Sequence, residues 1–302
     1  MLPEREFMNK EKFIYALGFF DGVHRGHQTL VYACQTMARE AGVGTAAITF
    51  EQHPRALFSK ELPPLLNTTA DRCDLLQQYG IDRILTYPVT EAVMGMPWRK
   101  FLLELCREQG AAGFVCGHDF RFGHKGEGNH EKLRGFCAEF GLSCAVIPEQ
   151  DLEGVRVSST HIRGLLENGQ MEQAVKFLGH PHILTGEVVS GRQLGRTIGI
   201  PTANLHLPQD VLVPKFGVYC CKAIVDGKTY LAVTNVGNRP TVGGHRVTVD
   251  PWLLDFEGDL YGKIMTLEFY AFLRPEKKFA SLDELRQEIR KNAEQTREFF
   301  EK

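Results

Sequence analysis

The sequence predicts an α/β domain with a doubly wound parallel sheet, followed by a mainly antiparallel β domain that ends in a helix. Short apolar runs alternate with amphipathic stretches between residues 13 and 148, which is typical of parallel strands joined by crossover helices. The pattern changes after residue 184, where strand-like segments follow one another and Asp226-Gly227 gives a hairpin signal. The second half is therefore predicted to be an antiparallel sheet or a small barrel.

The spacing of apolar residues places the elements of the first half. Residues 13–19 are rich in aromatic and β-branched side chains, which predicts a buried strand, and residues 27–41 repeat apolar side chains at helical spacing. The same two patterns predict further strands near 44–50, 82–89, 113–117 and 144–149. They predict further helices near 71–80, 98–110, 130–140, 159–168 and 171–178.

The second half contains five strand-like segments and one long helix. The segments are TGEVVSG, GVYCCKAIV, TYLAVTNVG, RVTVDPWLLDF and KIMTLEFYAFL. Ser281 and Glu284 have the spacing of a capping box and predict the start of the helix. A chain of 302 residues is long for one core, and GHPH at 179–182 fits a boundary between domains at 1–180 and 181–302. The apolar side of the helix is predicted to consist of Leu282, Leu285, Ile289, Ala293 and Phe300.

Composition narrows the classes of function. A net charge of −2 excludes the global basic surface that binds nucleic acid or anionic membranes without specificity, so the expected partners are small molecules. The charged start MLPEREFMNKEK and the lack of an apolar run of about 18 residues indicate neither a signal peptide nor a membrane span. The eight cysteines form no C-x-x-C motif, which favours buried free thiols over a zinc site. These features predict a cytoplasmic protein and leave its oligomeric state open.

The segment GFFDGVHRGHQTL, residues 18–30, spans the end of the first predicted strand and the start of the first predicted helix. Such a turn lies at the carboxyl edge of an open α/β sheet, where ligands bind, and the helix start offers free N–H groups to phosphate. His24 and His27 can donate hydrogen bonds to phosphate oxygens, and Gly26 lets the backbone approach a phosphate closely. The alternative is that the two histidines are ordinary polar caps of the helix.

Two later segments carry polar residues at comparable positions. CGHDFRFGHKGEGN follows a predicted strand, so that Asp119 either contacts a substrate or is a solvated loop carboxylate. VSSTHIRGLL opens a predicted helix, where Ser159 and Thr160 suit helix caps in any protein. Arg163 follows on the same face of the first turn, which would give a phosphate two hydroxyls and a positively charged fork.

Four blocks of the first half resemble, in order, those of the adenylyltransferase half of the bacterial bifunctional riboflavin kinase and FMN adenylyltransferase (FAD synthetase) family. The blocks are GFFDGVHRGHQ, TFEQHP, CGHDFRFG and VSSTHIR. The strand–HxGH–helix pattern also resembles the nucleotidyltransferase superfamily, which uses it to hold the α- and β-phosphates of ATP. The chain departs from the family pattern at Phe19, where Asn is frequent, and at Gln52, where Pro is frequent.

This resemblance implies a site for ATP and FMN in the first half. The implied catalytic residues are His24, His27 and Arg163. The implied ATP contacts are Gly18, Phe20, His24, Gly26, His27, Ser159, Thr160 and Arg163. The implied flavin contacts are His53, Pro54, Asp119 and Phe120.

The segment GEVVSGRQLGRTIGIPTANL, residues 186–205, is rich in glycine but contains neither a Walker A nor a G-x-G-x-x-G motif. Its glycines alone indicate no more than bulges and turns of a barrel. Thr202 and Asn204, however, stand two apart on one strand face, which puts a hydroxyl beside an amide oxygen. Oxygen ligands of this kind suit Mg²⁺ that is bound through ATP phosphates.

This segment resembles the GxxxGRxLGxPTAN motif of the riboflavin kinase half of the same family, and FGVYCCKAIV, TNVGNRPTV and LLDFEGDLYGK resemble its later blocks. The resemblance, which now covers nearly the whole chain, implies a six-stranded antiparallel barrel that holds ATP and Mg²⁺. Asp250 stands where the family has its catalytic base, a Glu, and Asn292 stands where Asp is common, as an implied flavin contact. The implied ATP contacts are Gly191, Gly195, Arg196, Thr202 and Asn204, of which Thr202 and Asn204 would hold the metal.

These features predict a two-domain enzyme that uses ATP twice. The second domain is expected to phosphorylate riboflavin to FMN and the first to adenylylate FMN to FAD with release of pyrophosphate, with no covalent enzyme intermediate. One alternative is a riboflavin kinase with a degenerate first domain, against which the retained histidines, hydroxyls and arginine of the first half argue. The other is a flavin- or nucleotide-binding regulator without turnover, which only Asp250 in place of Glu favours.

Overall fold

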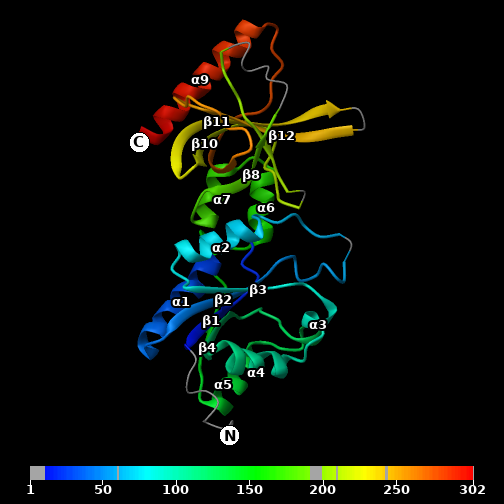
Figure 1. The fold of residues 1–302 in the computed structure, drawn as a ribbon, viewed down its shortest axis with the longest axis vertical. Coiled ribbons are helices and arrows are strands. Elements are labelled where there is room, and N and C mark those ends of the chain that lie inside the picture. The colour runs from blue at the N-terminus through cyan, green and yellow to red at the C-terminus, as the bar shows by residue number, and fades with distance from the viewer. Residues whose placement is uncertain (1–10, 60, 191–198, 209, 242–243, 302) are drawn as a thin grey trace. The chain divides into compact units, whose positions relative to one another are not determined.

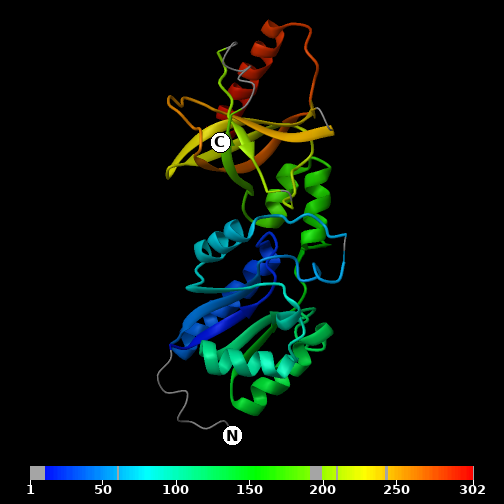
Figure 2. The same ribbon diagram turned by 45° about the vertical axis from the view of Figure 1, so that its right-hand side comes forward.

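The computed structural model of the protein describes residues 11–59, 61–190, 199–208, 210–241 and 244–301. The chain forms two compact units, each built around its own sheet (Figures 1 and 2). One unit consists of the chain up to Pro63 together with Thr69–Ser158. The other consists of Pro64–Thr68 together with Ser159–Lys302, so the helices that follow residue 158 pack with the second unit.

The first unit is built on a five-stranded sheet. Its strands are β1 (Phe13–Leu17), β2 (Gly44–Phe50), β3 (Arg83–Tyr87), β4 (Ala111–Gly117) and β5 (Ser143–Ile147). They lie in the order β3-β2-β1-β4-β5, and every neighbouring pair is parallel. Because β1 is central and later strands are added on both sides of it, the predicted doubly wound parallel sheet is confirmed.

Helices cover both faces of this sheet (Figure 1). They are α1 (Arg25–Ala41), α2 (Thr69–Gln78), α3 (Glu91–Met94), α4 (Trp98–Gln109) and α5 (His130–Phe140). On one face, the thiol of Cys34 in α1 donates to the carbonyl oxygen of Ile14 in β1 at 3.1 Å. On the other face, Tyr15 of β1 packs in one apolar cluster with Leu102 of α4 and Phe136 of α5. Successive side chains of β1, such as those of Ile14 and Tyr15, therefore pack into separate core layers on the two faces of the sheet.

A few short elements carry no usable sequence signal. They are α3, a 3₁₀ turn at His124–Gly126, and the two-stranded hairpin of β6 (Asp151–Leu152) and β7 (Val155–Arg156). Each is too short to show an apolar period, which is the reason that spacing does not predict it.

The second unit contains a closed six-stranded barrel. Its strands are β8 (His182–Val189), β9 (Asn204–His206), β10 (Gly217–Val225), β11 (Lys228–Thr241), β12 (Gly244–Leu253) and β13 (Ile264–Arg274). They follow the order β10-β11-β12-β9-β8-β13, and each neighbouring pair is antiparallel. In the hairpin between β10 and β11, Asp226 and Gly227 have φ values of 50° and 71°, the left-handed pair that the Asp-Gly signal predicts. The predicted small antiparallel barrel is confirmed.

Three helices pack with the barrel: α6 (Ser159–Glu167), α7 (Met171–Leu178) and α9 (Leu282–Glu301). Helix α7 lies against β8 and β13, and α9 lies against β10 and β11. The backbone N–H of Glu284 donates to Oγ of Ser281 at 3.1 Å, so the predicted cap starts α9.

The predicted apolar side of α9 is wrong at Leu282, which is 65% exposed. The buried residues of α9 are Asn292, Ala293 and Thr296, two of which are polar. They tolerate burial because their polar groups are hydrogen-bonded: Thr296 donates to the carbonyl oxygen of Asn292 at 2.8 Å. A prediction from apolar spacing counts only apolar residues and therefore misses a polar buried side.

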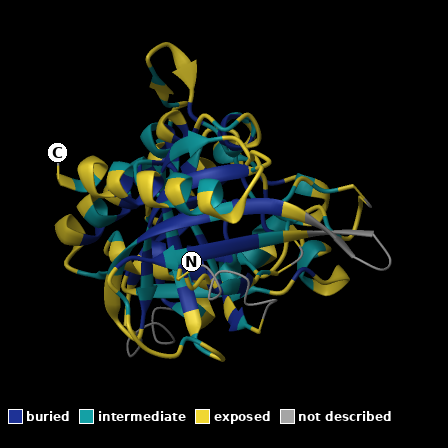
Figure 3. Cartoon of the chain, turned by 90° about the horizontal axis from the view of Figure 1, so that it is seen from above, coloured by how far each residue is buried: buried dark blue, intermediate teal, exposed yellow. Residues whose placement is uncertain are grey.

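Buried residues are concentrated in the strands, and exposed residues follow the outer sides of the helices (Figure 3). All eight cysteines are free thiols; six are buried, and Cys73 and Cys144 are half-buried. Over the described ranges, no three His, Cys, Asp or Glu side chains are grouped as metal ligands. No helix in that part of the chain is both long and apolar enough to cross a membrane.

Candidate functional site

The turn after β1 has an unusual backbone. Phe20, Gly22 and Val23 have φ values of 58°, 84° and 38°, and the N–H of Val23 donates to the carbonyl oxygen of Phe20 at 3.0 Å. A left-handed conformation is rare for a β-branched residue such as valine and stores strain. Strained backbone of this kind gathers at functional sites, and this turn leads directly into α1.

His24 caps α1. Its Nδ1 accepts a hydrogen bond from the backbone N–H of His27 at 3.3 Å, and its ring stacks on the ring of His27 with the centroids 3.7 Å apart. His24 is thus a polar cap of α1 through its Nδ1 atom, as the alternative predicted, and its Nε2 atom takes no part in the cap. Because Nδ1 acts as an acceptor, a neutral His24 ring carries its proton on Nε2, which remains a donor.

His27 is half-buried, and its Nδ1 has no hydrogen-bond partner among the described residues. Burial holds the pKa of His27 well below its ordinary value of 6.5, and the nearby charges of His24 and Arg72 lower it further. The His27 ring is therefore neutral at pH 7, so it can donate from one nitrogen and accept at the other.

Two glycines make room for aromatic rings in this turn. A Cβ atom at Gly26 would lie 3.3 Å from ring atoms of His24, and one at Gly18 would lie 3.0 Å from the ring of Phe20. The Phe20 ring in turn meets the edge of the His27 ring, with the centroids 5.3 Å apart. Glycine at these two positions therefore keeps the histidine pair closely packed.

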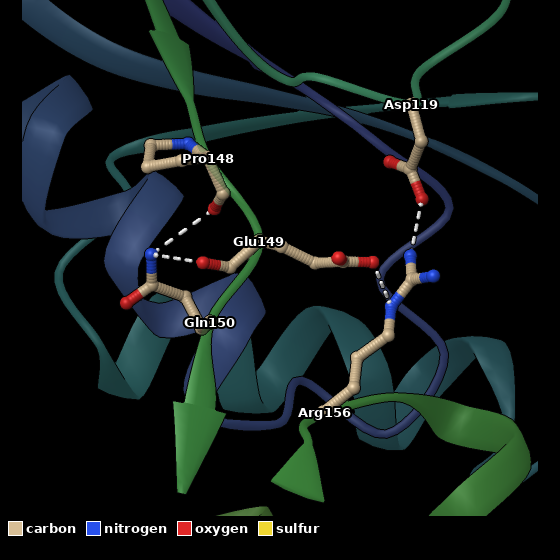
Figure 4. Close-up of polar contacts among 5 residues, drawn as sticks. All are labelled: Asp119, Pro148, Glu149, Gln150 and Arg156. Carbon is tan, nitrogen blue, oxygen red and sulfur yellow. Dashed lines mark hydrogen bonds and ion pairs between the residues drawn. The ribbon is translucent and has the colours of Figure 1, made fainter. Parts of the chain in front are cut away.

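The turn after β4 lies at the same edge of the sheet, because β1 and β4 are neighbouring parallel strands. This edge, where the strand order reverses, is the usual ligand crevice of a doubly wound sheet. Asp119 lies in that turn, and one of its carboxylate oxygens is 2.9 Å from Nη2 of Arg156 (Figure 4). Glu149 contacts Nε of the same arginine at 2.5 Å, so Asp119 is oriented by an exposed ion-pair network. Phe120 stacks on Phe122 with the centroids 5.8 Å apart.

The loop after β2 contains His53 and Pro54, the other residues implied to contact the flavin. Nδ1 of His53 accepts from the backbone N–H of Arg55 at 3.1 Å. The ring of Phe19, from the turn after β1, meets the edge of the His53 ring with the centroids 5.3 Å apart. The structure thus brings together two segments that the sequence motifs indicated separately.

Arg72 lies beside this turn, although no motif indicated it. Its guanidinium carbon is 4.6 Å from the centroid of the Phe19 ring, and the whole residue is buried. The buried residues of α2 are Asp71, Arg72, Leu75 and Leu76, so apolar spacing along this helix gave no signal that could have found Arg72.

In the second unit, α6 begins at Ser159, and Thr160 is exposed in its first turn. Arg163 lies one turn further along and is only 9% exposed. Its Nε donates to the carbonyl oxygen of Pro64 at 2.8 Å, which fixes the guanidinium. The proposed ATP contacts of these three residues remain predictions.

The barrel places the predicted kinase residues on one face of β9 and β12. Along the extended segment, Thr202 is exposed, Ala203 buried, Asn204 half-buried and Leu205 buried, which confirms the alternation that puts Thr202 and Asn204 on one side. Leu205 pairs with Val249 of the antiparallel strand β12.

The register of these two strands brings Asn204 opposite Asp250. The pairing of Leu205 with Val249 places Ala203 opposite Pro251, and the N–H of Ala203 indeed donates to the carbonyl oxygen of Pro251 at 2.8 Å. Residues directly opposite in an antiparallel pair share a face, so the amide of Asn204 and the carboxyl of Asp250 lie on the same side. On the other side of β12, Asp250 pairs with Asn235 of β11, a residue of the TNVGNRPTV segment whose role the sequence did not indicate.

Asn292, the remaining implied flavin contact, is 1% exposed. Its Oδ1 accepts from Nε of Arg274 at 3.0 Å, and its Nδ2 donates to Gln295 at 3.1 Å. The bond to Arg274 anchors α9 to the end of β13, the bond to Gln295 lies within α9, and a flavin contact stays a prediction. Gly191, Gly195 and Arg196 lie outside the described residues.

Comparison with known proteins assigns both halves to one enzyme family. The FAD synthetase family model matches residues 6–161, and the riboflavin kinase family model matches residues 178–300. The chain is 35% identical over 294 residues to the bifunctional riboflavin kinase/FMN adenylyltransferase of Escherichia coli strain K12, covering 96% of this chain and 94% of that protein. The chain belongs to this family. The protein of the same name from Listeria monocytogenes is 32% identical over 292 residues, which cover 96% of this chain and 93% of that one.

A solved structure described as a macrolide-efflux protein from Streptococcus pneumoniae is also similar. It is 28% identical, with a TM-score of 0.85 over 97% of this chain and 96% of that chain. As a family member with both domains, this protein is a riboflavin kinase and an FMN adenylyltransferase, and riboflavin, FMN and ATP are its substrates. The bifunctional prediction is thus supported over the kinase-only and regulator alternatives.

Proposed function

We propose that the turn after β1 is the adenylyltransferase site and that the Asn204–Asp250 face of the barrel is the kinase site. The observation that carries the first assignment is the stacked histidine pair at the crevice edge of the sheet, in which burial keeps the pKa of His27 well below its ordinary value. The register that sets a carboxyl opposite an amide supports the second. The residues that carry the two activities are proposed to divide into 1–180 and 181–302, whereas α7 (Met171–Leu178) packs against the kinase barrel and stabilises it.

In the adenylyltransferase site, a phosphate oxygen of FMN attacks the α-phosphorus of ATP, and pyrophosphate leaves. The charge that develops on the phosphate oxygens is stabilised by Nε2–H of His24 and by the neutral ring of His27. Ser159, Thr160 and Arg163 would hold further ATP oxygens. Gly18, Phe20 and Gly26 shape the turn, and His53, Pro54, Asp119 and Phe120 are proposed to contact the flavin.

In the kinase site, Asp250 accepts the proton of the riboflavin 5′-hydroxyl, whose oxygen attacks the γ-phosphorus of ATP, and ADP leaves. Asp250 is only 5% exposed, which keeps competing water away from the carboxyl. Thr202 and Asn204 fit Mg²⁺, because hydroxyl and amide oxygens are ligands this ion accepts beside phosphate and water. When bound, the ion supplies charge neutralisation on the ATP phosphates.

We further infer that the enzyme works in the cytoplasm, which its free thiols support. Both activities are tested by incubating the protein with riboflavin, Mg²⁺ and ATP and separating FMN from FAD, and the division of labour is tested by repeating the assay with a His24→Ala, His27→Ala variant and with Asp250→Asn. Appearance of FMN followed by FAD is expected. FMN that accumulates without FAD would support a kinase alone, and neither product would support a binding protein.

A further inference from the structure

Arg72, in the first turn of α2, is 0% exposed, yet two of its three guanidinium nitrogens have no hydrogen-bond partner among the described residues. Nη2 donates to the carbonyl oxygen of Phe50 and, at 3.1 Å, to Oγ1 of Thr69. Nε and Nη1 are buried and have no hydrogen-bond partner within the described part of the chain. An unpaired buried donor on a charged group is costly, so a purely structural arginine is expected to use all its nitrogens.

The surroundings of Arg72 are those of the adenylyltransferase turn. Burial lowers the pKa of Arg72, and the carboxylate of Asp21 opposes this effect. The charge of Arg72 is in turn one cause of the lowered pKa of His27. Arg72 is therefore close to Asp21, within the strained turn, and to His27, which follows it. Its positive charge acts on the His27 ring.

We propose that Arg72 is a further phosphate-binding residue of the adenylyltransferase site, whose Nε–H and Nη1–H groups hold oxygens of a substrate phosphate. The proposal rests on the assignment of His24 and His27 to this site. Nε–H and Nη1–H lie on different edges of the planar guanidinium, so each donates to its own phosphate oxygen. The reaction brings two anions together, the FMN phosphate and the ATP triphosphate, and a cation beside the histidines reduces their repulsion.

The ring of Phe19 packs against the guanidinium of Arg72. It is half-buried, lies over the guanidinium and meets His53 on another side. Binding of a phosphate at Nε and Nη1 therefore requires the ring to turn aside.

The test is the adenylylation of supplied FMN by the full chain with Arg72→Met or Arg72→Lys, measuring KM for ATP and for FMN separately. We expect the Met variant to lose about 10- to 100-fold in kcat/KM, the size of a lost hydrogen bond to a charged group. A raised KM for ATP assigns the guanidinium to the nucleotide, and a raised KM for FMN assigns it to the flavin phosphate. Because Lys keeps the charge but has a single donor nitrogen, full rescue by Lys would overturn the two-donor geometry.

Thr69→Val is the matched control. It removes a partner of Nη2 on the same helical turn and leaves Nε and Nη1 untouched, so it should lower thermal stability without changing either KM. Riboflavin phosphorylation should stay unchanged in every variant. Folded Arg72 variants with unchanged kinetics overturn the proposal, whereas retention of FAD formation in a His24→Ala, His27→Ala variant overturns the site itself.

Variants of a buried arginine can fail to fold, and the unmodified chain then provides the test. In protein labelled with ¹⁵N-arginine, the Nε–H groups of Arg72, Arg163 and Arg274 are all shielded from solvent, so the Arg72 signal is identified by its NOE to the ring protons of Phe19. Addition of FMN, or of a non-hydrolysable ATP analogue, is expected to shift this signal. An Arg72 signal that neither ligand moves rules the proposal out.

Discussion

The two sites are built in opposite ways. In the first unit, the functional groups proposed to stabilise the developing charge, those of His24 and His27, come from one turn, and strained backbone at Phe20 and Val23 sets their positions. In the barrel, they come from β9, β11 and β12, and only strand register brings Asn204, Asp250 and Asn235 together. The first site is thus preorganised locally, whereas the second depends on the integrity of a whole barrel.

This difference predicts that the kinase unit needs all the elements that hold its barrel closed. Met171, Ala174, Phe177 and Leu178 of α7 are buried, and α7 lies against β8 and β13. A fragment of residues 181–302 lacks three large apolar side chains that each contribute about 1.5–3 kcal/mol when buried. It should therefore be far less stable to denaturant than a fragment of residues 159–302, and it should phosphorylate riboflavin poorly. Equal stability and equal activity would show that α7 is dispensable and that the barrel stands alone.

Within the barrel, Asp250→Asn should remove the base with little change of shape. A positioned base contributes on the order of 10² to 10⁴ in rate, so riboflavin phosphorylation should fall by that factor while supplied FMN is still converted to FAD. Asp255→Asn is the matched control, because Asp255 is exposed and contacts Arg297 on the surface. If Asp250→Asn is no slower than Asp255→Asn when chemistry limits the rate, Asp250 is not the base.

In the first unit, His24→Ala with His27→Ala should lower FAD formation by roughly 10² or more, the size typical of lost transition-state donors, while FMN formation persists. His24→Asn separates the two roles of His24, because asparagine is a good helix cap but has no ring Nε2–H. FAD formation at the parent rate in His24→Asn would show that His24 only caps α1.

The contrast also explains what the sequence could predict. The histidine pair and the Thr202–Asn204 spacing are local patterns, so they were predictable, as were the parallel sheet and the Asp226-Gly227 hairpin. Asn235 and Arg72 were not, because their places depend on strand register and on how a helix docks beside a distant turn. Contacts between segments that are distant in the chain produce no repeating pattern of apolar residues, so the spacing of residues in the sequence does not predict them.

Each unit also contains a histidine whose pKa is lowered by desolvation, and the two should differ in what they affect. His27 belongs to the adenylyltransferase turn, whereas His182, at the start of β8, is 1% exposed, with Nε2 3.3 Å from the carbonyl oxygen of Leu212. Burial lowers the pKa of His182 from 6.5 to about 4. His182 should therefore affect stability rather than catalysis.

The sign of that effect follows from proton binding. Between pH 6.5 and pH 4, the unfolded chain binds a proton at His182 and the folded chain does not, so stability falls as the pH falls through this range. The expected loss between pH 7 and pH 5 is about 2 kcal/mol. Denaturant unfolding of the full chain at both pH values measures it, with His182→Gln as the comparison, since glutamine keeps a donor for Leu212 but does not titrate. If the parent and His182→Gln lose the same stability between pH 7 and pH 5, burial of His182 is not the cause, and other groups of the barrel carry its acid sensitivity.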